Sequence, residues 1–263
     1  LTLEGSLAAL RASLAARLAA EPLGANAVSG AAPWTPGRID VGAFALQGEA
    51  GRLDASGHLD TGAGRRWAVQ ARATDFCPTG WAPALRCAMS GTASLDGAFG
   101  TPLALAVEST LEGTVNDHPA RIAGRVAALP DGRWQVDELR LASGANTLAL
   151  DGSVGEQIAL DATLVVANLA DTIATATGTG GGSFSVRASR ADPQIKGTLR
   201  LRDAAWNGMA VGSLMLEADW RGLAQAGNSV RLALGEARWQ DIAGITLDAS
   251  LAGQGAGAGN CPI

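Results

Sequence analysis

The sequence predicts an all-β protein, built as an elongated antiparallel sheet that extends in one direction. Three observations support this fold class: apolar and polar residues alternate along most of the chain, turn dipeptides separate the alternating runs, and segments repeat at an offset of about 91 residues. Hydrophobic residues make up 47 % of the 263 residues, charged residues 17 %, and 35 residues are glycine. Such a chain is expected to fold and to turn often.

Alternation is the main evidence for strands. In residues 158–166, Ile158, Leu160 and Leu164 share one face while Asp161 and Thr163 share the other. The same pattern occurs in residues 53–59, 67–73, 103–107, 195–202, 214–220 and 245–251. We expect about fourteen strands, where a typical sheet has about five or six.

Two segments are exceptions to this clear strand pattern. Residues 7–20 fit a helix, with Leu7, Leu10, Leu14 and Leu18 on one face, but they also alternate, and we favour a strand because the surrounding sequence is strand. Residues 168–174 are expected to form one short helical turn.

Turn chemistry separates the expected strands. Five short segments favour the positive φ of tight hairpins, which implies antiparallel neighbours. They are Asp96-Gly97, Asp131-Gly132, residues 143–146, Asp151-Gly152 and Asn207-Gly208. Residues 178–182 are expected to be a longer flexible connection, and they lack the Gly-Lys-Ser/Thr of a phosphate loop.

The chain is expected to be one elongated β segment, residues 1–263, with internal repeat units at about 52–141 and 147–251 and a flexible tail at 253–263. It contains no run of 18 apolar residues and no signal-peptide pattern at Leu1, so we expect neither a membrane helix nor a signal peptide in it. Because it starts and stops in the middle of the alternating pattern, we interpret it as a piece of a longer protein.

Cys77 and Cys87 flank a turn-rich segment and could close a disulfide in an oxidising compartment, worth roughly 2–3 kcal/mol. Two separate buried thiols are an equal alternative. A zinc site is not expected, because closely spaced Cys pairs with matching His or Cys are missing.

Charge and motifs argue against several function classes. A net charge of −5 without a Lys/Arg run argues against nucleic-acid binding. His58 and His118 lie in polar stretches, the carboxylates fall mostly on polar faces or turns, and no G-x-S-x-G motif occurs, so we expect neither an enzyme nor a cofactor nor a metal. An aromatic content of 4 % without Tyr argues against a transmembrane barrel with aromatic girdles.

Several segments, taken in order, carry a family resemblance. They are residues 139–152, 160–169, 182–186, 192–199 and 212–214, which include Gly182-Ser183-Phe184-Ser185-Val186 and Gly212-Ser213-Leu214. In this order the chain resembles the TamB family of AsmA-like proteins, periplasmic bridges of Gram-negative bacteria.

The resemblance implies a U-shaped sheet, that is, an elongated curled antiparallel sheet (a β-taco) with an apolar concave groove. It places this sheet in a periplasmic protein whose full-length form is anchored in the inner membrane. It also implies carriage of phospholipid or another acyl lipid between the membranes, a role in outer-membrane and autotransporter assembly, and the outer-membrane barrel TamA as partner of the full-length protein.

The expected lipid groove consists of the apolar members of the alternating runs. These are Leu103, Leu105, Val107, Leu148, Leu150, Ile158, Leu160, Leu164, Phe184, Val186, Leu199, Leu201, Leu214, Leu216, Leu232, Leu234, Leu247 and Leu251. The structural alternative is a closed β-sandwich in which these residues pack against one another. The functional alternative is a periplasmic scaffold or chaperone that offers a sheet edge to outer-membrane strands by β-augmentation.

Overall fold

The computed structural model describes residues 2–6, 9–20, 24–62, 64–77, 86–100, 104–189, 193–222, 227–239 and 242–253. The chain divides into two compact units, Leu1–Ser143 and Gly144–Ile263, and each is an antiparallel sheet in which consecutive strands pair. The all-β antiparallel prediction is therefore confirmed. The division falls between the two expected repeat units, whose repetition stays a prediction; residues 254–263 of the expected tail lie outside the described part.

Unit 1 holds ten strands in the described residues, each antiparallel to the next. Their bounds are β1 (Thr2–Ser6), β2 (Ala9–Ala20), β3 (Gly24–Thr35), β4 (Arg38–Gly48), β5 (Gly51–Asp60), β6 (Arg66–Phe76), β7 (Cys87–Ala98), β8 (Ala104–Val115), β9 (His118–Ala128) and β10 (Trp134–Ser143).

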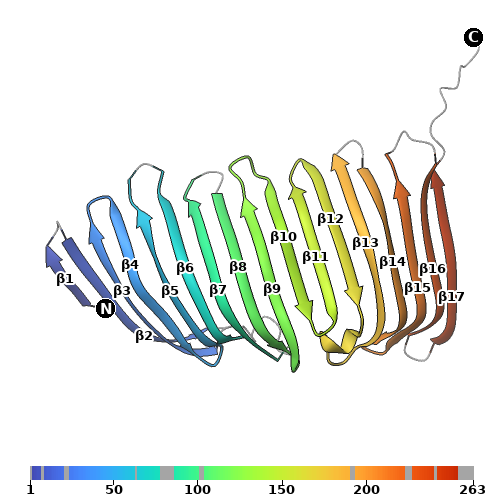
Figure 1. Cartoon of the computed structure of the whole chain (residues 1–263), viewed down its shortest axis with the longest axis horizontal. Helices are drawn as coiled ribbons and strands as arrows, with labels where there is room; N and C mark the ends of the chain where they lie inside the picture. The colour runs from blue at the N-terminus through green and yellow to red at the C-terminus, as the bar shows by residue number, and fades with distance from the viewer. Residues whose placement is uncertain are drawn as a thin grey trace, which may run out of the picture. The chain divides into compact units, whose positions relative to one another are not determined.

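Unit 2 holds seven strands and one short 3-10 helix in the described residues. Their bounds are β11 (Asn146–Val154), β12 (Gln157–Val166), η1 (Leu169–Asp171), β13 (Thr177–Ser189), β14 (Pro193–Trp206), β15 (Met209–Trp220), β16 (Asn228–Trp239) and β17 (Ile242–Gly253). The seventeen strands of the described chain exceed the fourteen expected. Figure 1 shows the hairpins following one another within each unit.

The strand predicted within residues 7–20 and the helical turn predicted within residues 168–174 are both present. Residues 9–20 form β2, the strand that we favoured over a helix, while Leu7 and Ala8 lie outside the described residues. The helical turn is η1, which begins after Asn168; the Asn168 side chain accepts a hydrogen bond from the backbone N–H of Ala170 at 3.2 Å. Such a cap is the usual reason that a helix starts at an asparagine.

Some expected turns are present and others are wrong. Asn207 (φ 49°) and Gly208 (φ 79°) join β14 to β15 with the two positive φ values of a type I′ hairpin. Residues 130–132 and 144–145 are also turns. Asp96-Gly97 and Asp151-Gly152, however, lie inside β7 and β11.

Gly97 and Gly152, which we wrongly assigned to turns, are glycines because atoms of neighbouring strands leave no room for a side chain. A methyl group on Gly97 would lie 2.8 Å from the Trp67 indole, and one on Gly152 would lie 2.9 Å from the Cα of Leu160. The flexible connection expected at residues 178–182 is also wrong, because this run belongs to β13. Its glycines lie close to the neighbouring strands: a methyl group on Gly180 would lie 2.6 Å from a Leu201 methyl on β14.

Irregular residues bend the strands near one end of unit 2. Asp203 in β14 and Glu236 in β16 have φ of 50° and 54°, and Gly178 in β13 has φ of 124°. The register shifts beside Gly178 and Glu236, as at a β-bulge. Because bulges bend a strand and increase its twist, they account for the curvature near these strand ends in Figure 1.

Candidate functional site

The register of unit 2 gathers leucines from successive strands into rows. Leu148 pairs with Leu164, Leu164 with Gly182, and the row continues through Leu199, Leu216 and Leu232. Direct partners in an antiparallel ladder project to the same side, so this leucine row crosses β11–β16 on one face of the sheet. We call this side the apolar face of unit 2.

Three further rows lie on the apolar face. One joins Leu150, Ala162, Phe184, Gly197, Ala218, Val230 and Leu251; a second joins Leu160, Val186, Ile195 and Trp220; a third joins Leu201, Leu214, Leu234 and Leu247. All fifteen groove residues that the sequence predicts between Leu148 and Leu251 therefore share this face. Sequence reasoning omitted Ile195, Trp220 and Val230 from the groove, although each continues the same alternation.

Unit 1 has a comparable apolar face. Leu105 pairs with Gly97 and Ala128, and Val107 pairs with Leu95 and Val126. Leu103, the third predicted groove residue of this stretch, lies outside the described residues. The rows continue through strands that the predicted groove left out, and include Leu53, Leu59, Trp67, Val69 and Ile122.

Among the described residues, no second layer covers the apolar face of unit 2. None of its fifteen predicted groove residues is fully buried; Leu247 and Leu251 are 46 % and 60 % exposed. Among the described residues, the fully buried apolar side chains are mostly alanines. In a β-sandwich the inward leucines of two sheets would interdigitate and lose nearly all exposure, so this exposure argues against a closed core.

The opposite face carries ion pairs that join neighbouring strands. Arg187 on β13 contacts Asp161 on β12 at 2.7 Å, and Arg231 on β16 contacts Asp248 on β17 at 3.0 Å. Hydrogen bonds from Arg187 and then Ser185 lower the pKa of the Asp161 carboxyl. These pairs are exposed, and exposed pairs stabilise a fold only weakly. Their main effect is to keep this polar face charged and hydrated.

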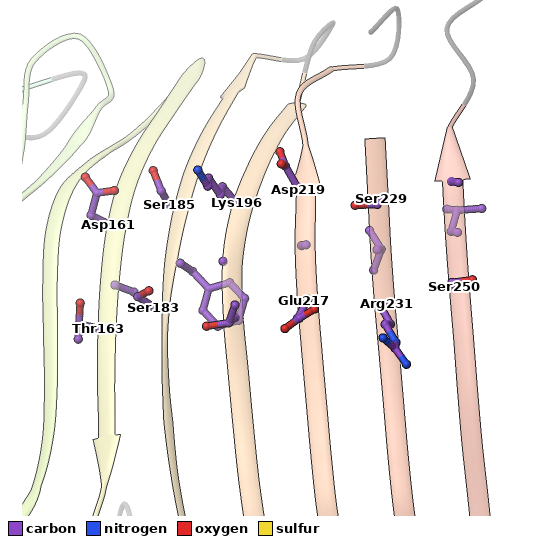
Figure 2. Close-up of a pocket in the computed structure, with 18 residues that line it drawn as sticks. Asp161, Thr163, Ser183, Ser185, Lys196, Glu217, Asp219, Ser229, Arg231 and Ser250 are labelled. Carbon is purple, nitrogen blue, oxygen red and sulfur yellow. The ribbon is translucent and has the colours of Figure 1, made fainter. Parts of the chain in front are cut away.

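A hollow of about 770 Å³ crosses β12–β17. On each strand it is lined by three consecutive residues, of which the outer two belong to the polar face. Figure 2 shows the polar side chains in two rows, one with Asp161, Ser185, Lys196, Asp219 and Ser229, the other with Thr163, Ser183, Glu217, Arg231 and Ser250. The row that contains Leu199 and Leu216 lies outside this hollow.

The two candidate cysteines are bonded. Cys77, directly after β6, and Cys87, the first residue of β7, form a disulfide with their Cα atoms 5.2 Å apart. The backbone N–H of Cys77 also donates to the Ala50 carbonyl at 2.8 Å, which ties this corner to the start of β5.

The described residues contain no cluster of His, Cys, Asp and Glu that could hold a metal ion. His58 lies within β5 and His118 begins β9, so the two histidines are on separate strands. No helix in the described part of the chain has the length and hydropathy to cross a membrane.

Residues 1–256 match the family model described as the N-terminal domain of TamB. No curated protein and no solved structure matches the chain.

Proposed function

Because the chain belongs to the TamB family, we propose that the apolar face of unit 2 shields the acyl chains of phospholipids as they pass between the inner and outer membranes. The chain would serve as a periplasmic segment of an intermembrane bridge with a role in outer-membrane assembly. The observation that supports the proposal is the uncovered apolar face, fifteen predicted groove residues on one side of one sheet.

The energetic reason for such a face is the cost of moving lipid tails through water. At about 0.8 kcal/mol per CH2, two long acyl chains cost on the order of 20 kcal/mol when exposed. A row of aliphatic side chains open along one side can remove much of this cost while the headgroup stays hydrated. Such a role needs no catalytic group, metal ion or cofactor.

The chemical uniformity of the rows favours passage over tight binding. Leu199, Leu201, Leu214, Leu216 and Leu232 present the same side chain at successive strands. A ligand that moves along similar sites meets no single deep energy minimum. We propose TamA at the outer membrane as the partner of the full-length protein.

Arginine substitutions on the two faces test the proposal. Leu199→Arg on β14 and Leu216→Arg on β15 place a charge on the apolar face, whereas Thr198→Arg places one on the polar face of β14. We expect phospholipid that copurifies from a Gram-negative periplasm, quantified by mass spectrometry, to fall about tenfold or more in the first two variants and to stay unchanged in the third. All three should keep their β-sheet circular dichroism, because an open face lets an arginine reach water.

Three results would count against the proposal. Unfolding of both leucine variants would indicate a closed core, and a wild-type chain free of phospholipid would remove the lipid role. Capture of unfolded barrel proteins in place of lipid would favour the scaffold alternative, in which a sheet edge pairs with outer-membrane strands.

A further inference from the structure

Aromatic side chains gather at one end of the apolar face of unit 1. The last row of this face before the strands end crosses β3–β10. Its register partners, taken from strand to strand, are Trp34, Ile39, Leu59, Trp67, Gly97, Leu105, Ala128 and Trp134. Three of the seven tryptophans of the protein therefore lie in one row at the strand ends.

Phe99 adds another aromatic side chain just beyond the end of β7. It follows Gly97 by two residues, so its side chain lies on the same face, and its ring centroid is 6.0 Å from that of Trp67. Its backbone N–H donates to the Arg65 carbonyl at 3.1 Å, which holds this segment beside the start of β6. Phe99 and Trp134 are 52 % and 49 % exposed, so this end of the face is open to a ligand.

The Trp67 indole carries a buried N–H group without an acceptor. Among the described residues, no oxygen or nitrogen accepts a hydrogen bond from its Nε1, which is shielded from solvent. The ring lies over the neighbouring strand, because a methyl group on Gly97 would lie 2.8 Å from Cζ2 and 3.0 Å from Cε2, the carbon bonded to Nε1. A buried donor without an acceptor is destabilising, and the N–H of a buried tryptophan usually has a partner. This N–H is therefore available to an acceptor on a bound molecule.

The surroundings of Trp67 determine which acceptor fits. The next row of the same face joins Val69, Leu95, Val107 and Val126, so a ligand that lies on the face meets hydrocarbon beyond the indole. An acyl ester combines a hydrocarbon chain with a carbonyl oxygen at its end. Tryptophan is enriched where the hydrocarbon of a membrane meets its polar groups, because the ring is apolar and the N–H is a donor. An acyl ester thus matches both the row of tryptophans and the aliphatic row beside it.

We infer that Nε1 of Trp67 donates a hydrogen bond to an ester carbonyl of a glycerolipid whose acyl chain lies along the apolar face of unit 1. This inference rests on the proposed function, extends it to unit 1 and assigns the ester group to one end of the strands. The carbonyl reaches the buried Nε1 when a side chain beside the indole moves. The Phe99 ring lies beside the indole and has room to turn outward, because it is half-exposed.

Two short-chain lipids that differ in one functional group test this inference. Dihexanoyl phosphatidylcholine carries ester carbonyls, and its dihexyl ether analogue carries none. Each lipid is titrated below its micelle concentration into the isotope-labelled 263-residue chain, and the indole N–H and leucine methyl signals are followed by NMR. We expect the Trp67 N–H signal, identified by its loss in Trp67→Phe, to move downfield with the ester lipid and not with the ether lipid.

The affinity at unit 1 is taken from the methyl signals of Leu105. The ester lipid should bind there about threefold more tightly than the ether lipid, the scale of one net hydrogen bond. Trp67→Phe keeps an aromatic ring and removes the donor, so it should bring this ratio to about one. Trp206→Phe, in unit 2, is the matched control and should leave the ratio at about three.

The outcomes separate this inference from the proposed function. Equal affinities of the two lipids for the wild type, a Trp67 N–H signal that ignores the ester lipid, or an unchanged ratio in Trp67→Phe each overturn the assignment of the ester carbonyl to Trp67. If the methyl signals of Leu199 and Leu216 still move with both lipids, the acyl-chain role of unit 2 stands without it. If no leucine methyl signal moves with either lipid, both proposals fail.

Discussion

The ring of Phe184 on β13 lies against Gly197 on β14. The two residues are register partners on the apolar face, and a methyl group on Gly197 would lie 2.5 Å from Cδ1 of the ring and 2.9 Å from the Phe184 Cα. The bulky side chain of one strand therefore occupies the space above a glycine of the next. Glycine at this position is a packing requirement within a strand.

Replacing Gly197 by alanine should destabilise unit 2. The added methyl group collides with the Phe184 ring and backbone, so we expect a loss of about 1–3 kcal/mol, measured by chemical denaturation. Gly42→Ala in β4 is the matched control, because nothing lies within 4 Å of its added methyl group. Equal stability of the two variants would show that the ring moves away freely.

Removing the disulfide should lower the stability of unit 1. Cys77 and Cys87 are ten residues apart, and closing a loop of about this length is worth roughly 2–3 kcal/mol in the unfolded state. We expect the double variant Cys77→Ala/Cys87→Ala to melt at a lower temperature than the wild type, and a reductant to shift the wild type but not the double variant. If the reductant lowers the melting temperature of both proteins by the same amount, its effect does not come from the Cys77–Cys87 disulfide.

The ion pair between Arg187 and Asp161 should be visible as a pH dependence. The hydrogen bond from Arg187 lowers the pKa of Asp161 in the folded chain. The pair therefore stabilises the fold above the unfolded pKa of about 3.9, and this contribution is lost as the pH falls through the lower folded value. We expect Arg187→Gln to raise the pKa of Asp161 in an NMR titration.

Arg200→Gln is the control for that titration, because Arg200 bonds to Glu217 and not to Asp161. It should leave the Asp161 titration in place. If Arg187→Gln and Arg200→Gln move the pKa of Asp161 equally, the shift comes from the general positive charge of the face.

Much of the fold could be predicted because the physical signal is simple. Successive side chains of a strand point to opposite faces, so a sequence pattern with a period of two indicates a strand. On β14, Leu199 and Leu201 alternate with Arg200 and Arg202 in this way. The same periodicity placed fifteen groove residues on one face. It failed to reveal all strands where both faces are small, as in the Ala- and Gly-rich β3.

The turns were harder to predict because glycine has two uses in a sheet. In Asn207-Gly208 it permits positive φ at a hairpin, whereas in Asp96-Gly97 it leaves room for the Trp67 side chain of the preceding strand, β6. Only the neighbouring strand distinguishes these uses, and it is far away in sequence.

A photo-crosslinking scan along β14 tests most directly whether the apolar face takes up acyl chains. A photoreactive residue is placed in turn at positions 195, 196, 198, 199, 200, 201 and 202, and crosslinked phospholipid is measured by mass spectrometry after irradiation in the periplasm. The account predicts capture at 195, 199 and 201 and little at 196, 198, 200 and 202, a period of two that follows the alternation of the strand. Equal capture at all positions, or capture only on the polar face, would contradict it.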